Sequence, residues 1–578
     1  MKSNPLQHLD NWNPQLLREL KGRLKLRNVL ITAVISLLGQ LLFMGQHYGR
    51  LPDSTGNYVH GLAHRYCTGT TAKYDGAVEC LRDGVGNFII NWQVWWLDLF
   101  EQLSWTGIFV LLLVGVFMLI SDLAQEANRG TLTFLQLSPQ SAKNILAGKL
   151  LGVPILLYLA LGLAVPLHLQ AGVAAGIPLR LILSFYAVTM AGCVFFYSIA
   201  LLQGLVGTWL KGFQPWLGTG LVLAGLWLAT TLRWVEHNPL DWLRLLLPAT
   251  FLPYLAHATG LSPELIRPYD PIIEGPLQLF FLPIGANYLA LAGFMIFNYG
   301  LWSFWIWQGL NRCFHTPSAT VLSRRQSYWL VAGFETLLLG FTLQFHSVNS
   351  FDEYLGIVLV ANLAFFLLLT AALLPHRQVL QDWARYRHEQ QLPRSTGKRR
   401  QRGLMRWNRA LVWDLIWGEK SPALVAIALN LTLVALVFIP WSVLDADWSE
   451  IVPTILVLLL SLASILVLAA IAQLILLMKT SKRSLWASGV VSAGVILPPI
   501  VLGMLEMTVH LTPVPWLFSA FPWIALDYVA ASSILLVFLG QLGLLSLLSW
   551  QLTRKLHQAG ESASKALLAG VPAGQRSY

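Results

Sequence analysis

Two acidic residues within long apolar stretches, Glu335 and Glu506, are the first candidates for chemistry. A carboxylate is costly in hydrocarbon, so each could mark a proton or ion site of an ion-coupled transporter. Glu335 lies about two turns from one end of its stretch, whereas Glu506 lies near the opposite membrane face, with His510 four residues further on. Because no series of carboxylates and histidines follows one stretch, we expect both side chains to reach a membrane surface or a helix partner. The ion-coupled carrier remains the alternative.

Sequence motifs of enzymes are absent. Gly148-Lys149 and Gly397-Lys398 both lack the upstream glycine and the following hydroxyl residue that a phosphate-binding P-loop needs. No zinc-protease motif, nucleophile elbow or dinucleotide fingerprint occurs. The four cysteines have no metal-ligand spacing. We therefore expect no catalytic residues, no metal and no cofactor bound by this chain.

Residues 122–149 form a polar segment between two apolar runs. Gly130 is expected to end the helix that arrives from residues 104–121. The next residues, up to position 137, can form about two helical turns with Leu132 and Leu135 on one face. Ser138 and Pro139 are predicted to be the N-cap and first residue of the following helix. Such a short, stiff connection could transmit an external push to the apolar helices on either side.

Two segments of the chain resemble the permease subunits of type-two ABC exporters. The first resembles their coupling helix and its surroundings, through Glu126, Arg129, Gly130, Thr131, Leu132, Leu135, Ser138, Pro139, Gly148 and Lys149. The second, residues 13–21, resembles the interfacial helix that opens such permeases, through Pro14, Leu16, Arg18, Glu19 and Leu20. The resemblance covers residues 1–312. It implies that a separate P-loop ATPase subunit, which binds ATP and Mg²⁺, docks on the coupling helix.

Composition indicates an all-α, polytopic membrane protein. Of the 578 residues, 56% are hydrophobic and 12% are charged, and the mean hydropathy is +0.59. A helix needs about 20 apolar residues to cross the hydrocarbon core. About twelve stretches qualify: 28–47, 104–121, 146–168, 181–205, 216–232, 282–308, 328–346, 354–374, 422–440, 452–478, 485–506 and 527–550.

The distribution of Lys and Arg orients these stretches. With both termini placed in the cytoplasm, all but eight of the 39 basic side chains fall on the inner side, as the positive-inside rule requires. The exceptions are Arg50, Arg65, Lys73, Arg82, Arg180, Arg233, Arg244 and Arg267. We therefore expect a multi-pass protein of the inner (plasma) membrane. Its net charge of +11 suits anionic lipid headgroups and needs no nucleic acid.

An external loop is predicted between residues 48 and 103, and it contains Cys67 and Cys80. In an oxidising compartment the two could form a disulfide, which would stabilise the loop by about 3 kcal/mol. Two free thiols remain the alternative.

Two six-span regions are predicted. The first, residues 1–312, ends with an apolar, proline-rich external stretch, 233–281, that suits short re-entrant helices, followed by its last span. The second, residues 313–578, contains a basic cytoplasmic linker, 375–421, that we expect to be solvated or in contact with lipid.

A weak internal repeat links the two regions. Trp407-Asn408, Leu411 and Asp414-Leu415 match Trp12-Asn13, Leu16 and Glu19-Leu20. The later loop 479–484 lacks the Gly-Thr-Leu and Ser-Pro elements of the first loop. Whether a second permease chain completes the path is left open, as is a non-transporting membrane assembly factor.

Overall fold

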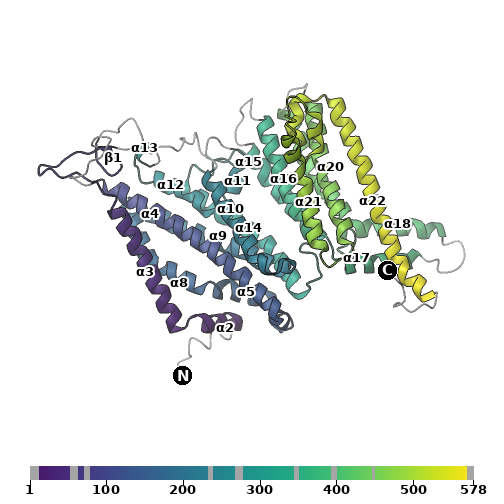
Figure 1. Cartoon of the computed structure of the whole chain (residues 1–578), viewed down its shortest axis with the longest axis horizontal. Coiled ribbons are helices and arrows are strands. Elements are labelled where there is room, and N and C mark those ends of the chain that lie inside the picture. The colour runs from purple at the N-terminus through teal and green to yellow at the C-terminus, as the bar shows by residue number, and fades with distance from the viewer. Residues whose placement is uncertain are drawn as a thin grey trace. The chain divides into compact units, whose positions relative to one another are not determined.

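Two compact units make up the chain, Met1–His315 and Thr316–Tyr578, and each is described by itself. A computed structural model (Figure 1) provides the structure. It describes residues 12–52, 63–69, 78–231, 238–266, 277–343, 351–391, 400–445 and 450–568.

In the described residues of the first unit, all regular elements are helices apart from one two-residue strand pair, in which Ala63 lies opposite Glu79. Its elements in chain order are α2 (Pro14–Arg23), α3 (Leu26–Tyr48), β1 (Ala63–His64), β2 (Val78–Glu79), α4 (Trp92–Phe109), η1 (Val110–Val114), α5 (Gly115–Arg129), α6 (Thr131–Gln136), α7 (Ala142–Gly152), α8 (Ile155–Ala174), α9 (Leu179–Val206), η2 (Gly207–Phe213), α10 (Gln214–Thr231), α11 (Asp241–Arg244), η3 (Pro248–Phe251), α12 (Leu252–His257), α13 (Pro263–Ile266) and α14 (Tyr288–His315).

The second unit is also helical. Its elements are α15 (Arg324–Thr342), α16 (Phe351–Leu373), α17 (Arg377–Gln391), α18 (Arg400–Trp417), α19 (Leu424–Asp445), α20 (Ile451–Leu476), α21 (Arg483–Met504), η4 (Val514–Phe518), η5 (Pro522–Tyr528) and α22 (Ala531–Leu568). The helix α20 lies at the centre and packs against α16, α19, α21 and α22.

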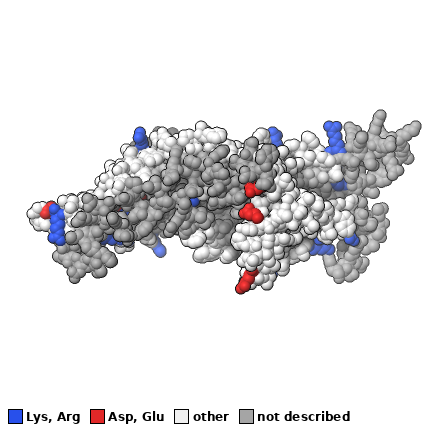
Figure 2. Space-filling model, turned by 90° about the horizontal axis from the view of Figure 1, so that it is seen from above, with Lys and Arg blue, Asp and Glu red and all other residues white. Residues whose placement is uncertain are grey.

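Within the described residues, ten helices are long and apolar enough to cross a membrane, which makes the chain a multi-pass α-helical membrane protein. They are Leu26–Tyr48, Trp92–Arg129, Ile155–Ala174, Leu179–Val206, Tyr288–His315, Tyr354–Leu373, Leu424–Val443, Ile451–Leu476, Arg483–Met504 and Ala531–Ala559. Figure 2 shows one face of the molecule, on which the described residues are mostly uncharged. The predicted stretches 216–232 and 328–346 overlap helices α10 and α15, which are not among these ten.

One predicted span is longer than expected, because α4, η1 and α5 form a continuous helical segment from Trp92 to Arg129. Its middle, Val110–Val114, is a π-helix. The Tyr197 hydroxyl of α9 donates to the carbonyl of Leu111 over 2.8 Å. A Cβ at Gly115 would lie 2.1 Å from that hydroxyl, so the close approach of Tyr197 requires glycine there.

Another predicted span is interrupted. The stretch 146–168 was expected to be one helix, but residues up to Gly152 belong to α7, and α8 begins at Ile155. The reason is Pro154, which lacks an amide hydrogen and therefore cannot donate to the carbonyl of Leu150. The Tyr158 hydroxyl donates to that carbonyl instead, over 3.1 Å.

The proline-rich stretch between α10 and α14 contains only short helices in its described part, α11, η3, α12 and α13. They are largely buried, and η3 and α12 pack against α4 and α9. Pro248 approaches α9 at Gly192, where a Cβ would lie 2.6 Å from its ring. The backbone of η3 and α12 is therefore covered by protein, as an apolar environment requires.

Candidate functional site

The turn between α5 and α6 is built on Gly130. Its φ of 73° and ψ of 0° lie in the left-handed region, where glycine carries no steric penalty, and they end α5 at Arg129. The Thr131 hydroxyl donates to the carbonyl of Glu126 over 3.2 Å. The direction of α6 is thus fixed relative to α5.

The short helix α6 has two different faces. Leu132 and Leu135 are buried, with 7% and 8% of their surface exposed, and α6 packs against α5. Phe134 and Leu137 are 77% and 81% exposed on the other side. A helix fixed on one face therefore presents two large apolar side chains that nothing in the chain's described part covers.

The predicted capping role of Ser138 and Pro139 is wrong. The Ser138 hydroxyl donates to the carbonyl of Leu135 over 2.8 Å and so closes the end of α6. The N-cap of α7 is Ser141, which has extended backbone and accepts from the amide of Asn144. A serine already donating to the preceding turn is poorly placed to accept from the next one.

The helix α2 lies against α7 at very short distance. Asn13 caps α2 by accepting from the amide of Leu16 over 2.9 Å, and its amide group donates to the carbonyl of Asn144 over 2.7 Å. A Cβ at Gly148 would lie 2.7 Å from the Asn13 side-chain oxygen, and one at Gly152 would lie 2.5 Å from the Cβ of Glu19. Two glycines one turn apart therefore allow α2 to contact the backbone of α7.

Lys149 is the centre of the site. Its side chain, from α7, is only 1% exposed. The ammonium nitrogen lies 2.6 Å from Oδ2 of Asp122, 2.9 Å from Oε2 of Glu126 and 3.7 Å from Oε1 of Glu19. Asp122 and Glu126 come from α5 and Glu19 from α2. One buried cation thus joins three helices.

Two arginines of α2 complete this cluster, which we call the Lys149 cluster. Arg23 lies 2.8 Å from Asp122 and 3.2 Å from Glu19, and Arg18 lies 3.5 Å from Glu126. Its three carboxylates and three cations balance in formal charge. Desolvation on its own lowers the pKa of the Lys149 ammonium, but Asp122 and Glu126 more than offset it and raise that pKa above its ordinary value.

The ligand atoms of the three carboxylates all lie within 4.8 Å of one another, a spacing that could hold a metal ion. The Lys149 ammonium already lies among them at ion-pair distance, however. The cluster is therefore an ion-pair network that joins helices, and the Lys149 ammonium is its central cation.

Sequence reasoning found some members of this cluster and missed others. Glu19, Glu126, Lys149 and Arg18 belong to the two predicted motifs, whereas Arg129 is exposed and lies outside the cluster. Two members, Asp122 and Arg23, were not predicted as site residues. Each lies four positions from a carboxylate that was, Glu126 or Glu19, and that helical spacing is the signal that could have found them.

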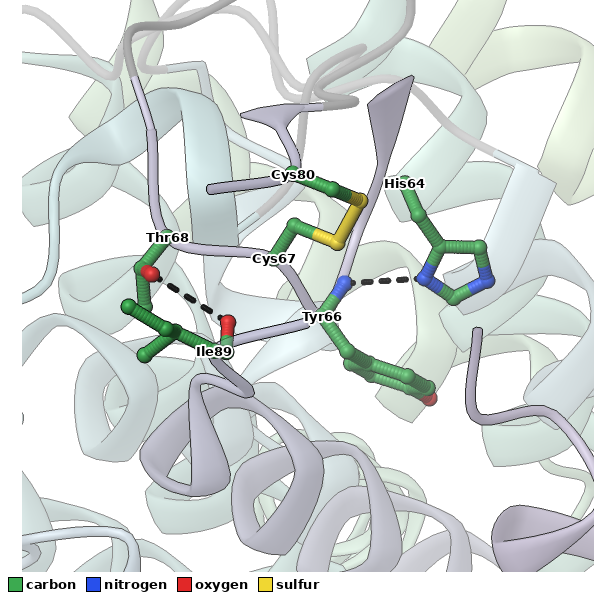
Figure 3. The surroundings of a disulfide bond; sticks show 6 residues. All are labelled: His64, Tyr66, Cys67, Thr68, Cys80 and Ile89. Carbon is green, nitrogen blue, oxygen red and sulfur yellow. Dashed lines mark hydrogen bonds between the residues drawn. A yellow bond between two sulfur atoms is a disulfide. The ribbon is translucent and has the colours of Figure 1, made fainter. Parts of the chain in front are cut away.

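A second cluster lies at the opposite end of the first unit, near the strand pair. Cys67 and Cys80 form a disulfide there, and around it the Thr68 hydroxyl donates to the carbonyl of Ile89 (Figure 3). Arg65 makes two contacts with Asp98 of α4, at 2.7 and 2.9 Å, and the Tyr66 hydroxyl donates to the same carboxylate. The disulfide therefore cross-links this loop internally, and the ion pair between Arg65 and Asp98 attaches the loop to α4.

The two acidic candidates lie in different surroundings. Glu335 is completely buried in α15, and the amide nitrogen of Asn362 lies 3.5 Å from its Oε2 atom. Glu506 was predicted within a span, but it follows the end of α21 at Met504, is exposed and has a φ of 52°. The helix ends before it, so only Glu335 is buried among helices.

No protein-family model matches the chain, and no curated protein or solved structure matches it either. The function therefore has to be inferred from the site itself.

Proposed function

We propose that this chain is the membrane-spanning permease subunit of an ATP-binding cassette exporter, and that a separate ATPase subunit drives it through α6. The observation that supports this proposal best is an exposed apolar pair, Phe134 of the short helix α6 and Leu137 directly after it, while the opposite face of α6 is buried. Exposed apolar side chains that are grouped on one surface and surrounded by polar residues are typical of a site that contacts another protein.

The Lys149 cluster supports a role in transmission. A displacement of α6 would also displace α5, because α6 packs against α5 and its Leu132 and Leu135 are buried. The ion pairs from Asp122 and Glu126 to Lys149 pass it to α7 and, through Glu19, to α2. Buried pairs with short distances resist separation, because breaking them leaves a charge without a partner. We therefore expect α2, the end of α5 and α7 to move as one body.

The partner would supply the chemistry. This chain has no P-loop, so ATP and Mg²⁺ would bind in the ATPase subunit, whose closure would move α6. In the resembled family, spans one, two and five open the path, which here would be α3, α4 to α5, and α10. The π-helix η1 interrupts the regular hydrogen-bond pattern of the second of these and gives it a point of bending.

The proposal includes the membrane topology. We propose twelve spans, with α10 and α15 added to the ten apolar helices, both termini in the cytoplasm, and the inner (plasma) membrane as location. The basic loops support this orientation, because Lys143, Lys420 and Lys482 then all lie on the inner side.

The test is purification from mild detergent with mass spectrometry of co-purifying proteins. The native chain is compared with the double variant Phe134→Ser/Leu137→Ser. Leu511→Ser serves as control, because Leu511 is 80% exposed but belongs to the second unit, in the segment between α21 and η4. We expect a P-loop ATPase with the native chain and the control, and at least a tenfold loss of it from the double variant, which corresponds to about 1.4 kcal/mol.

Two outcomes would contradict the proposal. Absence of any ATPase from the native, monodisperse protein would remove the exporter assignment. Retention of an ATPase by the double variant would place its docking surface elsewhere.

A further inference from the structure

The second unit contains a buried acid that the proposed function does not use. Glu335 of α15 and Asn362 of α16 are both 0% exposed. Their surroundings are apolar: Phe334 and Phe365 stack with ring centroids 3.9 Å apart, and Val331 and Leu338 of α15 are buried. An ionised carboxylate in such surroundings carries a large desolvation penalty unless a cation or several donors face it.

The hydrogen bonds of the pair do not suit an ionised carboxylate. The Asn362 amide nitrogen lies 3.5 Å from Oε2 of Glu335 and also donates to the carbonyl of Val358 over 3.2 Å. Oε1 of Glu335 and Oδ1 of Asn362 are both buried without a hydrogen-bond partner. An ionised carboxylate and an amide oxygen are both acceptors only, so neither can satisfy the other.

No counter-charge is within reach in the described part of this unit. Arg324 and Arg325 begin α15 at least ten residues before Glu335, which is about 15 Å along the helix. The Arg324 guanidinium donates to the carbonyls of Leu373 and Ser421 instead. Among the described side chains of α15, α16 and α19, the other titratable groups are Tyr328 and Tyr354, seven and more positions along the chain from Glu335.

The helices that pack on α15 and α16 add no cation near Glu335. From α19, Asn430 donates to Ser327 in the first turn of α15. The helix α20 contains no charged residue, and α18 meets the start of α15, where Tyr328 donates to the carbonyl of Ile416.

We infer that Glu335 is a proton-binding site: it carries a proton in the folded chain and joins α15 to α16 as a neutral acid–amide pair with Asn362. One added proton converts the carboxylate to a carboxylic acid and turns one acceptor into a donor. Oε1 then donates to Oδ1 of Asn362, while Oε2 accepts from the amide nitrogen. Both orphaned atoms gain a partner, and the charge disappears.

This site is independent of the ATPase-coupling proposal, because it lies in the other unit. The proposed protonation state also distinguishes between two roles for Glu335. An acid that couples transport to a proton gradient must release its proton in each cycle, whereas an acid that joins two helices keeps it.

The test is infrared spectroscopy of the purified protein at neutral pH, using the carbonyl stretch of a protonated carboxylic acid. Glu335→Gln is compared with wild type, and Glu506→Gln is the matched control, because Glu506 is exposed. We expect the protonated-acid band of the wild type to disappear in Glu335→Gln and to persist in Glu506→Gln. In Asn362→Leu the band should move to higher frequency, because the carbonyl loses its donor.

Thermal stability gives a second readout. Glutamine has the donor and acceptor of the neutral acid, so Glu335→Gln should keep the Tm of the wild type, whereas Glu335→Ala should lower it by leaving Asn362 unpaired. The proposal is overturned if Glu335→Gln leaves the infrared band unchanged, or if it lowers Tm as much as Glu335→Ala does.

Discussion

A single lysine determines how the helices at the candidate site are held. Lys149 is buried, and three carboxylates from two other helices face its ammonium group. Such a pairing contributes little net stability compared with apolar packing, but removal of one member leaves the others buried and uncompensated. The cluster therefore penalises separation of its helices more than it stabilises their contact.

We predict that Lys149→Met destabilises the chain by about 3 kcal/mol, the scale for an unpaired member of a buried ion pair. Lys143→Met is the matched control, since Lys143 lies on the same helix and is exposed. It should change stability by less than about 0.5 kcal/mol. Tm in detergent would be measured for both. Equal Tm values for the two variants would contradict the assigned role of Lys149.

The same pair of variants predicts a dependence on pH. The pKa of Lys149 is raised in the folded chain above its ordinary value of 10.5. A raised folded pKa means that the stabilisation is fully present below the ordinary value and is lost as pH rises through the folded value. The Tm difference between wild type and Lys149→Met should thus be constant near neutral pH and shrink only in strongly alkaline solution. If the Tm difference already disappeared between about pH 6 and about pH 8, it could not originate from the Lys149 ammonium.

Residue patterns predicted most members of this site, but they did not predict the contacts between these members. Glu126 and Lys149 both lie in the polar segment, but 23 positions separate them, and nothing in the sequence shows that the ammonium group of one faces the carboxylate of the other. Glu19 comes from a segment more than 100 positions earlier than either. The contact follows from tertiary packing of α2, α5 and α7, which local spacing does not contain.

At the scale of elements, the contact between α2 and α7 depends on the absence of two side chains. Gly148 and Gly152 lie one turn apart on α7 and face Asn13, Leu16 and Glu19 of the α2 region. Facing glycines let two helices approach until backbone and side chain touch. Because Glu19 lies at this contact, its position in the Lys149 cluster depends on it.

We predict that Gly152→Leu moves α2 away from α7, since even a Cβ would lie 2.5 Å from Glu19. Trypsin should then cleave after Arg18 and Lys21 of α2 faster than in wild type. Gly162→Leu on α8 is the control, because nothing lies within 4 Å of the position of its Cβ. Unchanged cleavage in Gly152→Leu would contradict a tight α2–α7 contact.

Helix boundaries were predictable where a single residue enforces them. Gly130 ends α5 as expected, because its left-handed backbone is the conformation that glycine favours. The misplaced N-cap at Ser138 has the opposite cause, since Ser138 and Ser141 are both suitable caps and tertiary context chooses between them. The π-helix of η1 has no local signal in the run Val110–Val114, because its partner Tyr197 comes from α9.

For the whole molecule, composition predicted the fold class, and hydropathy predicted most of the apolar helices. It failed to distinguish a span from a short helix where a proline interrupts the apolar run, as at Pro154. The weak internal repeat falls on α18, which precedes the candidate span α19 as α2 precedes α3. Asp414, at the position matching Glu19, pairs with Arg387 of α17. The matched elements therefore have similar positions in the chain order, but their acidic residues pair with different partners.

Whether α10 and α15 cross the membrane can be tested by determining on which side of the membrane three positions lie. Lys143, Leu243 and Lys420 are all exposed. Between the first two positions the chain crosses with α8, α9 and α10, and between the last two with α14, α15 and α16. If all six helices cross, Leu243 lies outside and the two lysines inside.

We predict that a membrane-impermeant maleimide labels Leu243→Cys in intact cells, and labels Lys143→Cys and Lys420→Cys only after permeabilisation. Cys193 and Cys313 are replaced by alanine so that only the introduced thiol reacts, while Cys67 and Cys80 remain in their disulfide. Labelling of Leu243→Cys on the same side as Lys143→Cys would remove α10 from the spans. Labelling of Lys420→Cys on the same side as Leu243→Cys would remove α15, and with it the placement of Glu335 in the membrane.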